Sequence, residues 1–120
     1  MSLEYKITAH TSGVKIINLA GKILANDNVD DIQLEIEEQL KKQEKLFVLD
    51  ISEVSYIDSS GLNFFLRIFT KIRNKAAEVI FCAPSTAVIQ LLKISKLDSV
   101  FTVCANQEEA LNLLIAKEHE

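Results

Sequence analysis

The sequence predicts a single α/β domain: a mixed, mostly parallel β-sheet with four helices packed on it, in the order β-β-α-β-α-β-α-β-α. Its 120 residues fit one domain that spans 1–120. Two almost wholly apolar segments, 46–51 and 79–83, are typical of strands covered on both faces. Amphipathic segments alternate with them. Only 3 glycines and 1 proline are available for the many turns that an all-β sandwich requires.

The first two strands are expected to form a hairpin. Residues 4–10 alternate loosely between apolar and polar side chains, and residues 14–20 are predicted as a second strand. The link between them, Thr11-Ser12-Gly13, is a turn signal. We expect Gly21 to end the second strand.

The first helix is predicted over residues 28–43. Acidic residues crowd its beginning and lysines its end, an order that the helix dipole favours by about 0.3–1 kcal/mol for each well-placed charge. Asn26-Asp27-Asn28 supplies candidates for the N-cap. Apolar residues recur at intervals of three or four, and the expected inward residues are Val29, Ile32, Ile36 and Leu40.

The rest of the chain alternates strands with helices. The remaining expected strands cover 46–51, 79–83 and 99–103, and the remaining expected helices cover 60–74, a segment from Pro84 onward, and 107–117. Residues 52–60 are expected to form a connection, and Pro84 suits the first turn of its helix. The inward residues expected in the last two helices are Val88, Leu91, Leu92, Ile94, Ala110, Leu111, Leu114 and Ile115.

The predicted helix over 60–74 carries more apolar residues than one buried face needs. At 3.6 residues per turn, one stripe is formed by Leu62, Phe65, Leu66, Phe69 and Ile72. Phe64 and Ile68 point well away from that stripe. Either a neighbouring helix covers this pair, or the pair stays exposed and marks an interaction surface.

Charge and hydropathy argue against two classes of partner. Lysine and arginine total 13 and aspartate and glutamate total 17, so the net charge is −4. A chain without a clustered basic face is not expected to bind nucleic acid directly. No apolar segment approaches the roughly 18 residues of a membrane span, and residues 1–10 lack the apolar core of a signal peptide. We therefore expect a cytoplasmic protein without direct membrane insertion.

The motif content does not support an enzyme. Cys82 and Cys104 form no C-x-x-C motif and are expected to be buried free thiols in a reducing compartment. His10 and His119 lie near the two ends, and no nucleophile elbow or glycine-rich phosphate loop occurs. No cluster has the spacing of metal ligands. The sequence therefore predicts no catalytic residue, no metal and no cofactor.

One polar segment stands out between a strand and a helix, namely Asp58-Ser59-Ser60-Gly61-Leu62. Ser59 or Ser60 is suited to cap the helix. Gly61 has no Cβ, which would let another chain or a phosphate approach closely, and a helix N-terminus favours an added phosphate. A capped helix with no further role explains the same residues, so both interpretations stay open on physical grounds.

This segment and its context resemble the STAS domain of bacterial anti-anti-sigma factors, which are also called anti-sigma factor antagonists. The resemblance covers nearly the whole chain. It includes the hairpin that ends in Leu19-Ala20-Gly21, the strand over 46–51, and the segment from Val79 to Pro84 followed by Ala87-Val88 and Leu91-Leu92. It implies the STAS fold and a regulatory binding protein rather than an enzyme.

The resemblance also implies a mechanism of partner switching. The unphosphorylated protein binds an anti-sigma factor and frees the sigma factor. The anti-sigma factor is itself a serine kinase that uses ATP, and a PP2C-type phosphatase reverses its reaction. Ser59 occupies the position of the phosphorylated serine. The expected partner-binding residues are Asp58, Ser59, Ser60, Gly61, Leu62, Phe64 and Ile68.

Two positions depart from the family pattern. Family members usually carry an aspartate three residues after the glycine of the second strand, where this chain has Leu24, with Asp27 as the nearest acid. The glycine that commonly follows Gly-Leu is Asn63 here. In the family the missing aspartate lies close to the phosphorylated serine, so its loss bears on how a kinase recognises this surface.

Two alternative functions remain open. STAS domains also act as subunits of lipid-transport ABC systems and as cytoplasmic parts of anion transporters, where they bind a partner without obligatory phosphorylation. A small-ligand or sensory domain would need converging polar groups, for which the sequence offers only Asn18, Asp50 and Thr102. Identification of the bound partner would discriminate among these functions.

Overall fold

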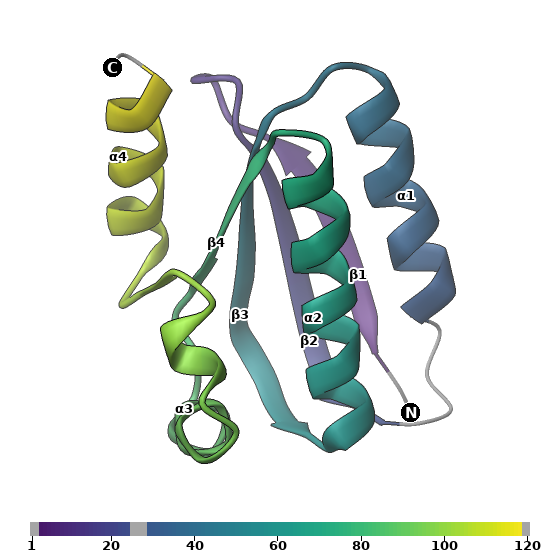
Figure 1. Ribbon diagram of the computed structural model, residues 1–120, viewed down its shortest axis with the longest axis vertical. Coiled ribbons are helices and arrows are strands. Elements are labelled where there is room, and N and C mark those ends of the chain that lie inside the picture. The colour runs from purple at the N-terminus through teal and green to yellow at the C-terminus, as the bar shows by residue number, and fades with distance from the viewer. Residues whose placement is uncertain (1–2, 25–28, 119–120) are drawn as a thin grey trace.

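The computed structural model describes residues 3–24 and 29–118, and it confirms the predicted α/β class and the order of the elements. Five strands form one sheet in the order β1-β2-β3-β4-β5 (Figure 1). β1 pairs with β2 antiparallel, and the other three neighbouring pairs are parallel. The elements are β1 (Glu4–Ala9), β2 (Lys15–Ile23), α1 (Val29–Lys41), β3 (Leu46–Ile57), α2 (Ser59–Asn74), β4 (Glu78–Cys82), α3 (Thr86–Ile94), the short 3₁₀ helix η1 (Leu97–Ser99), β5 (Val103–Cys104) and α4 (Gln107–Glu118).

The predicted hairpin of β1 and β2 is confirmed, but the prediction that Gly21 ends the second strand is wrong. Gly21 has a φ of +106° and lies inside β2, where the register against β3 shifts before Lys22. Glycine adopts this left-handed conformation without steric cost, and such residues are typical of bulges. β2 therefore continues to Ile23, and the backbone of Ile23 reaches the start of α2.

β3 is longer than the sequence pattern predicted. It spans 12 residues, so the first six residues of the expected connection over 52–60 belong to the strand. Val54 and Ile57 are buried in the main core, whereas the residues between and before them are exposed. A smaller apolar cluster, to which α4 contributes, includes Leu46 and Val48 but no later residue of β3, so the second half of the strand has only one face in a core.

The helices cover the two faces of the sheet unequally. α1, α2 and α3 contribute to one large apolar cluster with the strands, and α4 contributes to a smaller one on the opposite face. Figure 1 shows α1 and α2 beside each other along the sheet, with α4 away from them beyond β4. The smaller cluster consists of Val14, Ile16, Val48, Ile80, Cys82, Ala110 and Leu114.

Several boundaries in the second half differ from those predicted. Pro84 precedes α3, whose N-cap is Ser85, with the Val88 amide donating to the Ser85 hydroxyl at 3.3 Å. Ile94, expected to face inward, is 79% exposed because the buried residues of α3, Val88 and Leu92, lie on the other side of the helix. The strand expected over 99–103 is reduced to Val103–Cys104, since the chain first forms η1. The expected N-cap residues of α1, 26–28, lie outside the described residues.

The buried face of α2 overlaps the stripe that periodicity suggested but is centred differently: Phe65 and Ile72 are buried, and Leu62 and Phe69 pack partly against the main cluster. Its buried residues are Gly61, Phe64, Phe65, Ile68 and Ile72. Leu66, from the expected stripe, is 38% exposed. The buried face is thus turned by about a quarter of a revolution at 3.6 residues per turn. The helix turns this way because Phe64 and Ile68 enter the main cluster between the sheet and its neighbours, which settles the alternative left open for this pair.

None of the helices in the described part of the chain combines the length and the apolar character needed to cross a bilayer.

Candidate functional site at the start of α2

The segment that precedes α2 lies where two parallel strands end together. The Asp58 amide donates to the carbonyl of Ile23 at 3.3 Å, which joins the end of β3 to the end of β2. The Leu62 amide then donates to the Asp58 carbonyl at 3.1 Å and begins the helix. Carboxyl ends of parallel strands are a common place for functional groups, because the loops that follow them are held by the sheet.

Asp58 is the N-cap of α2, and the prediction that a serine caps this helix is wrong. Its Oδ1 accepts hydrogen bonds from the amides of Ser60 at 2.9 Å and Gly61 at 3.1 Å. The extended backbone of Asp58 (φ −104°, ψ −167°) directs its carboxylate toward these amides. The capping role therefore uses Asp58 and leaves both serine hydroxyls available for other contacts.

The two serines differ in their access to solvent. Ser59 is the first residue of α2 and is exposed, whereas Ser60 is half-buried. Among the described residues, none forms a hydrogen bond with the Ser59 hydroxyl. Ser59 is therefore the serine that a second protein can reach without movement of the backbone.

A glycine is needed at position 61 for a different reason from the one that the sequence suggested. It is buried, and a Cβ added to it would lie 2.7 Å from Cβ of Ile57 and 3.0 Å from the carbonyl oxygen of Ile23. Real Cβ atoms do not approach other atoms so closely, so glycine is required for α2 to pack on the ends of β2 and β3. The close approach is made by this chain's own core, and Gly61 does not offer a surface to a ligand.

The structure keeps some of the expected partner-binding residues at the surface and removes others. Ser59 is exposed, while Asp58, Ser60 and Leu62 are half-buried. Phe64 and Ile68 are fully buried, so the expectation that this pair marks an interaction surface is wrong. The pair is buried because the buried face of α2 is turned relative to the predicted stripe.

Exposed apolar residues precede and follow the site along the chain; the sequence pattern had already marked Leu24 and Leu66, but not Tyr56. Leu24 is 38% exposed and follows Ile23, whose carbonyl accepts from Asp58. Tyr56 is 50% exposed and lies two residues before Asp58. On α2 itself, Leu66 is exposed one turn beyond Asn63. In the sequence, only the irregular alternation of apolar and polar residues over 52–56 could have indicated that Tyr56 is exposed.

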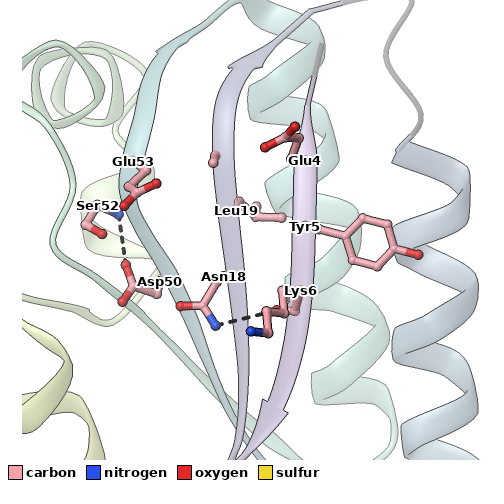
Figure 2. A pocket seen from close by; sticks show the side chains of 9 residues that line it. Glu4, Tyr5, Lys6, Asn18, Leu19, Asp50, Ser52 and Glu53 are labelled. Carbon is pink, nitrogen blue, oxygen red and sulfur yellow. Dashed lines mark hydrogen bonds between the residues drawn. The ribbon is translucent and has the colours of Figure 1, made fainter. Parts of the chain in front are cut away.

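The residues proposed for a small-ligand site lie elsewhere. Asn18 and Asp50 are half-buried on the face of the sheet opposite α1 and α2, beside a hollow of about 250 Å³ (Figure 2). Both Asp50 oxygens are engaged by the chain itself, Oδ1 with the Ser52 amide at 2.9 Å and Oδ2 with the Gln107 side chain at 2.8 Å. Thr102 is exposed and does not line the hollow. The three polar residues therefore do not converge.

Both cysteines are free thiols in neighbouring strands. Cys82 is buried and Cys104 is half-buried, and the two are register partners of β4 and β5. Burial, followed by the nearby Asp50 and Cys104, raises the pKa of Cys82 to about 12. In the described part of the chain, no group of three histidine, cysteine or acidic side chains is placed to hold a metal ion.

Comparison with known proteins agrees with this geometry. The family model described as the STAS domain matches residues 5–110. BtrV of Bordetella bronchiseptica, a protein classed with the anti-sigma factor antagonists, is 30% identical over 98 residues, which cover 82% of this chain and 84% of BtrV. The anti-sigma F factor antagonist of Paenibacillus polymyxa is 28% identical over 115 residues, covering 95% and 97% of the two chains.

Solved structures show the same fold. An anti-sigma factor antagonist from Mycobacterium paratuberculosis superimposes with a TM-score of 0.80 at 19% identity, covering 94% of each chain. The phosphorylated form of the Bacillus cell fate determinant SpoIIAA superimposes with a TM-score of 0.70 at 21% identity, covering 91% of this chain and 97% of SpoIIAA. The chain therefore belongs to the STAS domain family, and the relatives to which it is similar there are anti-sigma factor antagonists.

Proposed function

We propose that this protein is an anti-sigma factor antagonist that works by partner switching in the cytoplasm. Its unphosphorylated form binds an anti-sigma factor with serine kinase activity, and the sigma factor is thereby released. Phosphorylation of Ser59 by that kinase ends the binding, and a PP2C-type phosphatase restores it. The role is regulatory binding rather than catalysis.

The proposal rests on the exposure and position of the Ser59 hydroxyl. Ser59 is the exposed serine of the pair, its hydroxyl has no hydrogen bond within the described chain, and it is held at the start of a helix by the Asp58 cap. A kinase needs a hydroxyl that its bound ATP can reach. The hydroxyl oxygen of Ser59 would attack the γ-phosphorus of ATP and give its proton to a basic group of the kinase, while the bond from that phosphorus to the bridging oxygen breaks and ADP leaves.

The local electrostatics explain how phosphorylation would act without refolding. A phosphoserine adds about −1.5 to −2 charges at neutral pH. The amino end of α2 partly compensates them through its dipole. However, the amides of Ser60 and Gly61 already donate to Asp58, so the phosphate adds its charge beside a carboxylate. The fold is preserved, and the surface that meets the partner becomes strongly anionic.

The size of the required effect is modest. A hundredfold loss of affinity corresponds to about 2.7 kcal/mol. One phosphate that must lose its hydration when the partner docks on this surface, whose exposed apolar residues are Leu24, Tyr56 and Leu66, is sufficient for that loss. The contact surface in this proposal consists of Asp58, Ser59, Ser60 and Leu62 with these neighbours, and it excludes the buried Gly61, Phe64 and Ile68.

Leu24 makes this surface less acidic and more apolar than is usual in the family. Leu24 follows Ile23, whose carbonyl accepts from the Asp58 amide, and it replaces the aspartate that is usual in the family, so this surface carries one negative charge fewer. We expect a cognate kinase to contact this position through an apolar group. A Leu24→Asp variant would therefore be a poorer substrate for that kinase than the native protein.

Phosphorylation by purified kinases tests the proposal. Each anti-sigma factor encoded in the same genome is incubated with this protein and ATP, and the product is analysed by mass spectrometry. Ser59→Ala should abolish phosphorylation and retain binding, Ser60→Ala should retain both, and Ser59→Asp should weaken binding. Equal phosphorylation of the native protein and Ser59→Ala would overturn the assignment to Ser59. Binding to a transporter ATPase instead of any anti-sigma factor would favour the transporter-subunit alternative.

A further inference from the structure

α2 differs in charge from the rest of this acidic chain. The protein carries 17 acidic residues, yet the helix sequence SSGLNFFLRIFTKIRN contains none of them. Its cations are Arg67, Lys71 and Arg73. An exposed helix face without acids in a chain of net charge −4 is a local reversal of sign, and such reversals orient and select charged partners.

Two of the three cations form ion pairs within the part of the chain that the structure describes. Lys71 forms an ion pair with Glu37 at 2.8 Å, and this contact lowers the pKa of Glu37. Arg73 pairs with Glu78 at 2.8 Å and lies over the ring of Phe69. Arg67 is exposed, and no ion pair joins it to another described residue.

Arg67 lies on the same side of α2 as Ser59. At 3.6 residues per turn, Ser59, Asn63, Leu66 and Thr70 align along the helix opposite its buried face, with Arg67 beside them. A shallow hollow of about 510 Å³ follows this side and is lined by Asn63, Leu66, Arg67, Thr70, Lys71 and Asn74. Its lining holds two cations, one partly exposed leucine and no acid. We call the residues Ser59, Asn63, Leu66, Arg67 and Thr70 the outer face of α2.

We infer that the outer face of α2 is a docking surface for a segment of the anti-sigma factor in which acidic and aliphatic side chains lie together, and that Arg67 is its charged anchor. The inference rests on the proposed function. Leu66 supplies apolar contact, and the guanidinium of Arg67 offers a planar, bidentate donor to a carboxylate. The acidic residues that begin α1 would repel the same segment, so it lies along α2 and away from α1.

The docking surface also indicates which part of the partner a phosphate on Ser59 would repel. Ser59 and Arg67 are separated by eight residues, or about 12 Å along the helix axis. This separation exceeds the Debye length of about 8 Å at physiological salt, so Arg67 does not neutralise a phosphate on Ser59. The phosphate instead repels those acidic side chains of the partner's segment that lie beside Ser59, at the other end of the outer face from Arg67, which attracts the segment in the unphosphorylated state.

Charge reversal at one position tests the inference. The probes are the purified anti-sigma factors of the same genome, titrated by calorimetry against the native protein, Arg67→Gln, Arg67→Glu and the control Lys42→Glu. Lys42 is exposed in the turn after α1, and its reversal changes net charge by the same amount. We expect affinity to fall about threefold for Arg67→Gln and about tenfold or more for Arg67→Glu, with less than a twofold change for the control. The loss should shrink between about 50 and about 500 mM salt, as screening increases.

The outcomes separate the inference from the proposed function. If Ser59 is phosphorylated and binding occurs, but Arg67→Glu binds like the Lys42→Glu control, the docking surface is wrong and the proposed function stands. If no anti-sigma factor binds or phosphorylates the native protein, both fail. Concentration-dependent sedimentation of the native protein that Arg67→Glu abolishes would identify a second copy of this chain as the occupant and overturn the inference. Urea unfolding of every variant confirms that each is folded.

Discussion

Asp58 is the residue that prepares Ser59 for a partner, because it satisfies the helix amides and leaves the serine hydroxyl outward. Replacing Asp58 with alanine should lower the free energy of unfolding by about 1–2 kcal/mol, the usual cost of losing an N-cap. Ser59→Ala is the matched control and should change it by less than about 0.5 kcal/mol, as surface substitutions do. Urea unfolding followed by circular dichroism measures both. Equal effects of the two variants would mean that the cap does not stabilise α2.

Gly61 fixes how α2 sits on the sheet. An alanine there would place its Cβ against Cβ of Ile57, which no side-chain rotation can move away. We expect Gly61→Ala to lower the free energy of unfolding by about 1–3 kcal/mol, in the range of overpacked cores. The neighbouring Ser60→Ala is the control and should be milder. A Gly61→Ala variant with native stability would show that the helix shifts freely, contrary to the packing seen here.

The two thiols should differ in reactivity. The pKa of Cys82 is raised to about 12 by burial and then by Asp50 and Cys104, and burial also raises that of Cys104, with Glu109 adding to it. At pH 8, iodoacetamide should modify the half-buried Cys104 slowly and Cys82 only after unfolding, as measured by mass spectrometry. A Cys104→Ser variant should then show almost no native labelling. Rapid labelling of Cys82 in the folded protein would contradict its burial.

The same shift has a consequence for stability at high pH. The unfolded chain releases the Cys82 proton near its ordinary value of 9.0, whereas the folded chain retains it to about 12. The native state therefore binds more protons between these values. The contribution of Cys82 to stability is fully present below pH 9 and is lost as pH rises toward 12.

At the scale of the element, α2 shows that a periodic pattern can misplace the centre of a helix's buried face by about a quarter turn. Leu62, Leu66 and Phe69 complete a stripe as regular as the one that is buried. The choice depends on what surrounds the helix: the sheet lies below it, α1 beside it, and Gly61 anchors its start. Periodicity thus predicted the helix and its extent, while the neighbours decided which side faces the core.

Substitution at two positions of α2 distinguishes the faces. Phe64→Ala should lower the free energy of unfolding by about 3–5 kcal/mol, because Phe64 is fully buried against Phe65. Leu66→Ala, at a partly exposed position, should lower it by less than about 1 kcal/mol. The milder Phe64→Leu should keep the affinity for the anti-sigma factor. A specific loss of affinity in Phe64→Leu would return Phe64 to the contact surface.

The strands show a similar limit. The apolar run 46–51 predicted the first half of β3, where helices cover both faces. Beyond it, only one face is covered, and the exposed Ser52, Glu53 and Ser55 look like loop residues in the sequence. Periodic patterns of apolar residues indicate which residues are buried, so the second half of a strand that lies partly outside the core is predicted as a connection.

At the scale of the whole molecule, α4 is the one helix among the described residues that packs on the second face of the sheet. It contributes Ala110 and Leu114 to the smaller cluster, and Gln107 at its start donates to Asp50 of β3. Leu114→Ala should therefore lower the free energy of unfolding by about 2–5 kcal/mol. The adjacent Leu113 is 39% exposed, and Leu113→Ala should have little effect. If both variants unfold at the same urea concentration, the smaller cluster does not stabilise the fold.

The unequal covering also separates two regions of the molecule. The end of the sheet that α4 leaves open presents polar side chains such as Asn18 and Glu53 (Figure 2). The outer face of α2 lies on the opposite side, since α2 packs in the main cluster. A partner that docks along α2 therefore leaves the open sheet face untouched.

The sequence by itself determined the α/β class, the order of strands and helices, the hairpin, and the segment from Asp58 to Leu62 that carries the family resemblance. Those features follow from local patterns of apolar residues and from a short motif, both of which are present in the linear chain. The tertiary structure alone decided that Asp58 is the cap, that Gly61 is packed against Ile57, and that Phe64 and Ile68 are core residues. These depend on contacts between segments far apart in the sequence, and only such contacts determine which side of a helix is covered.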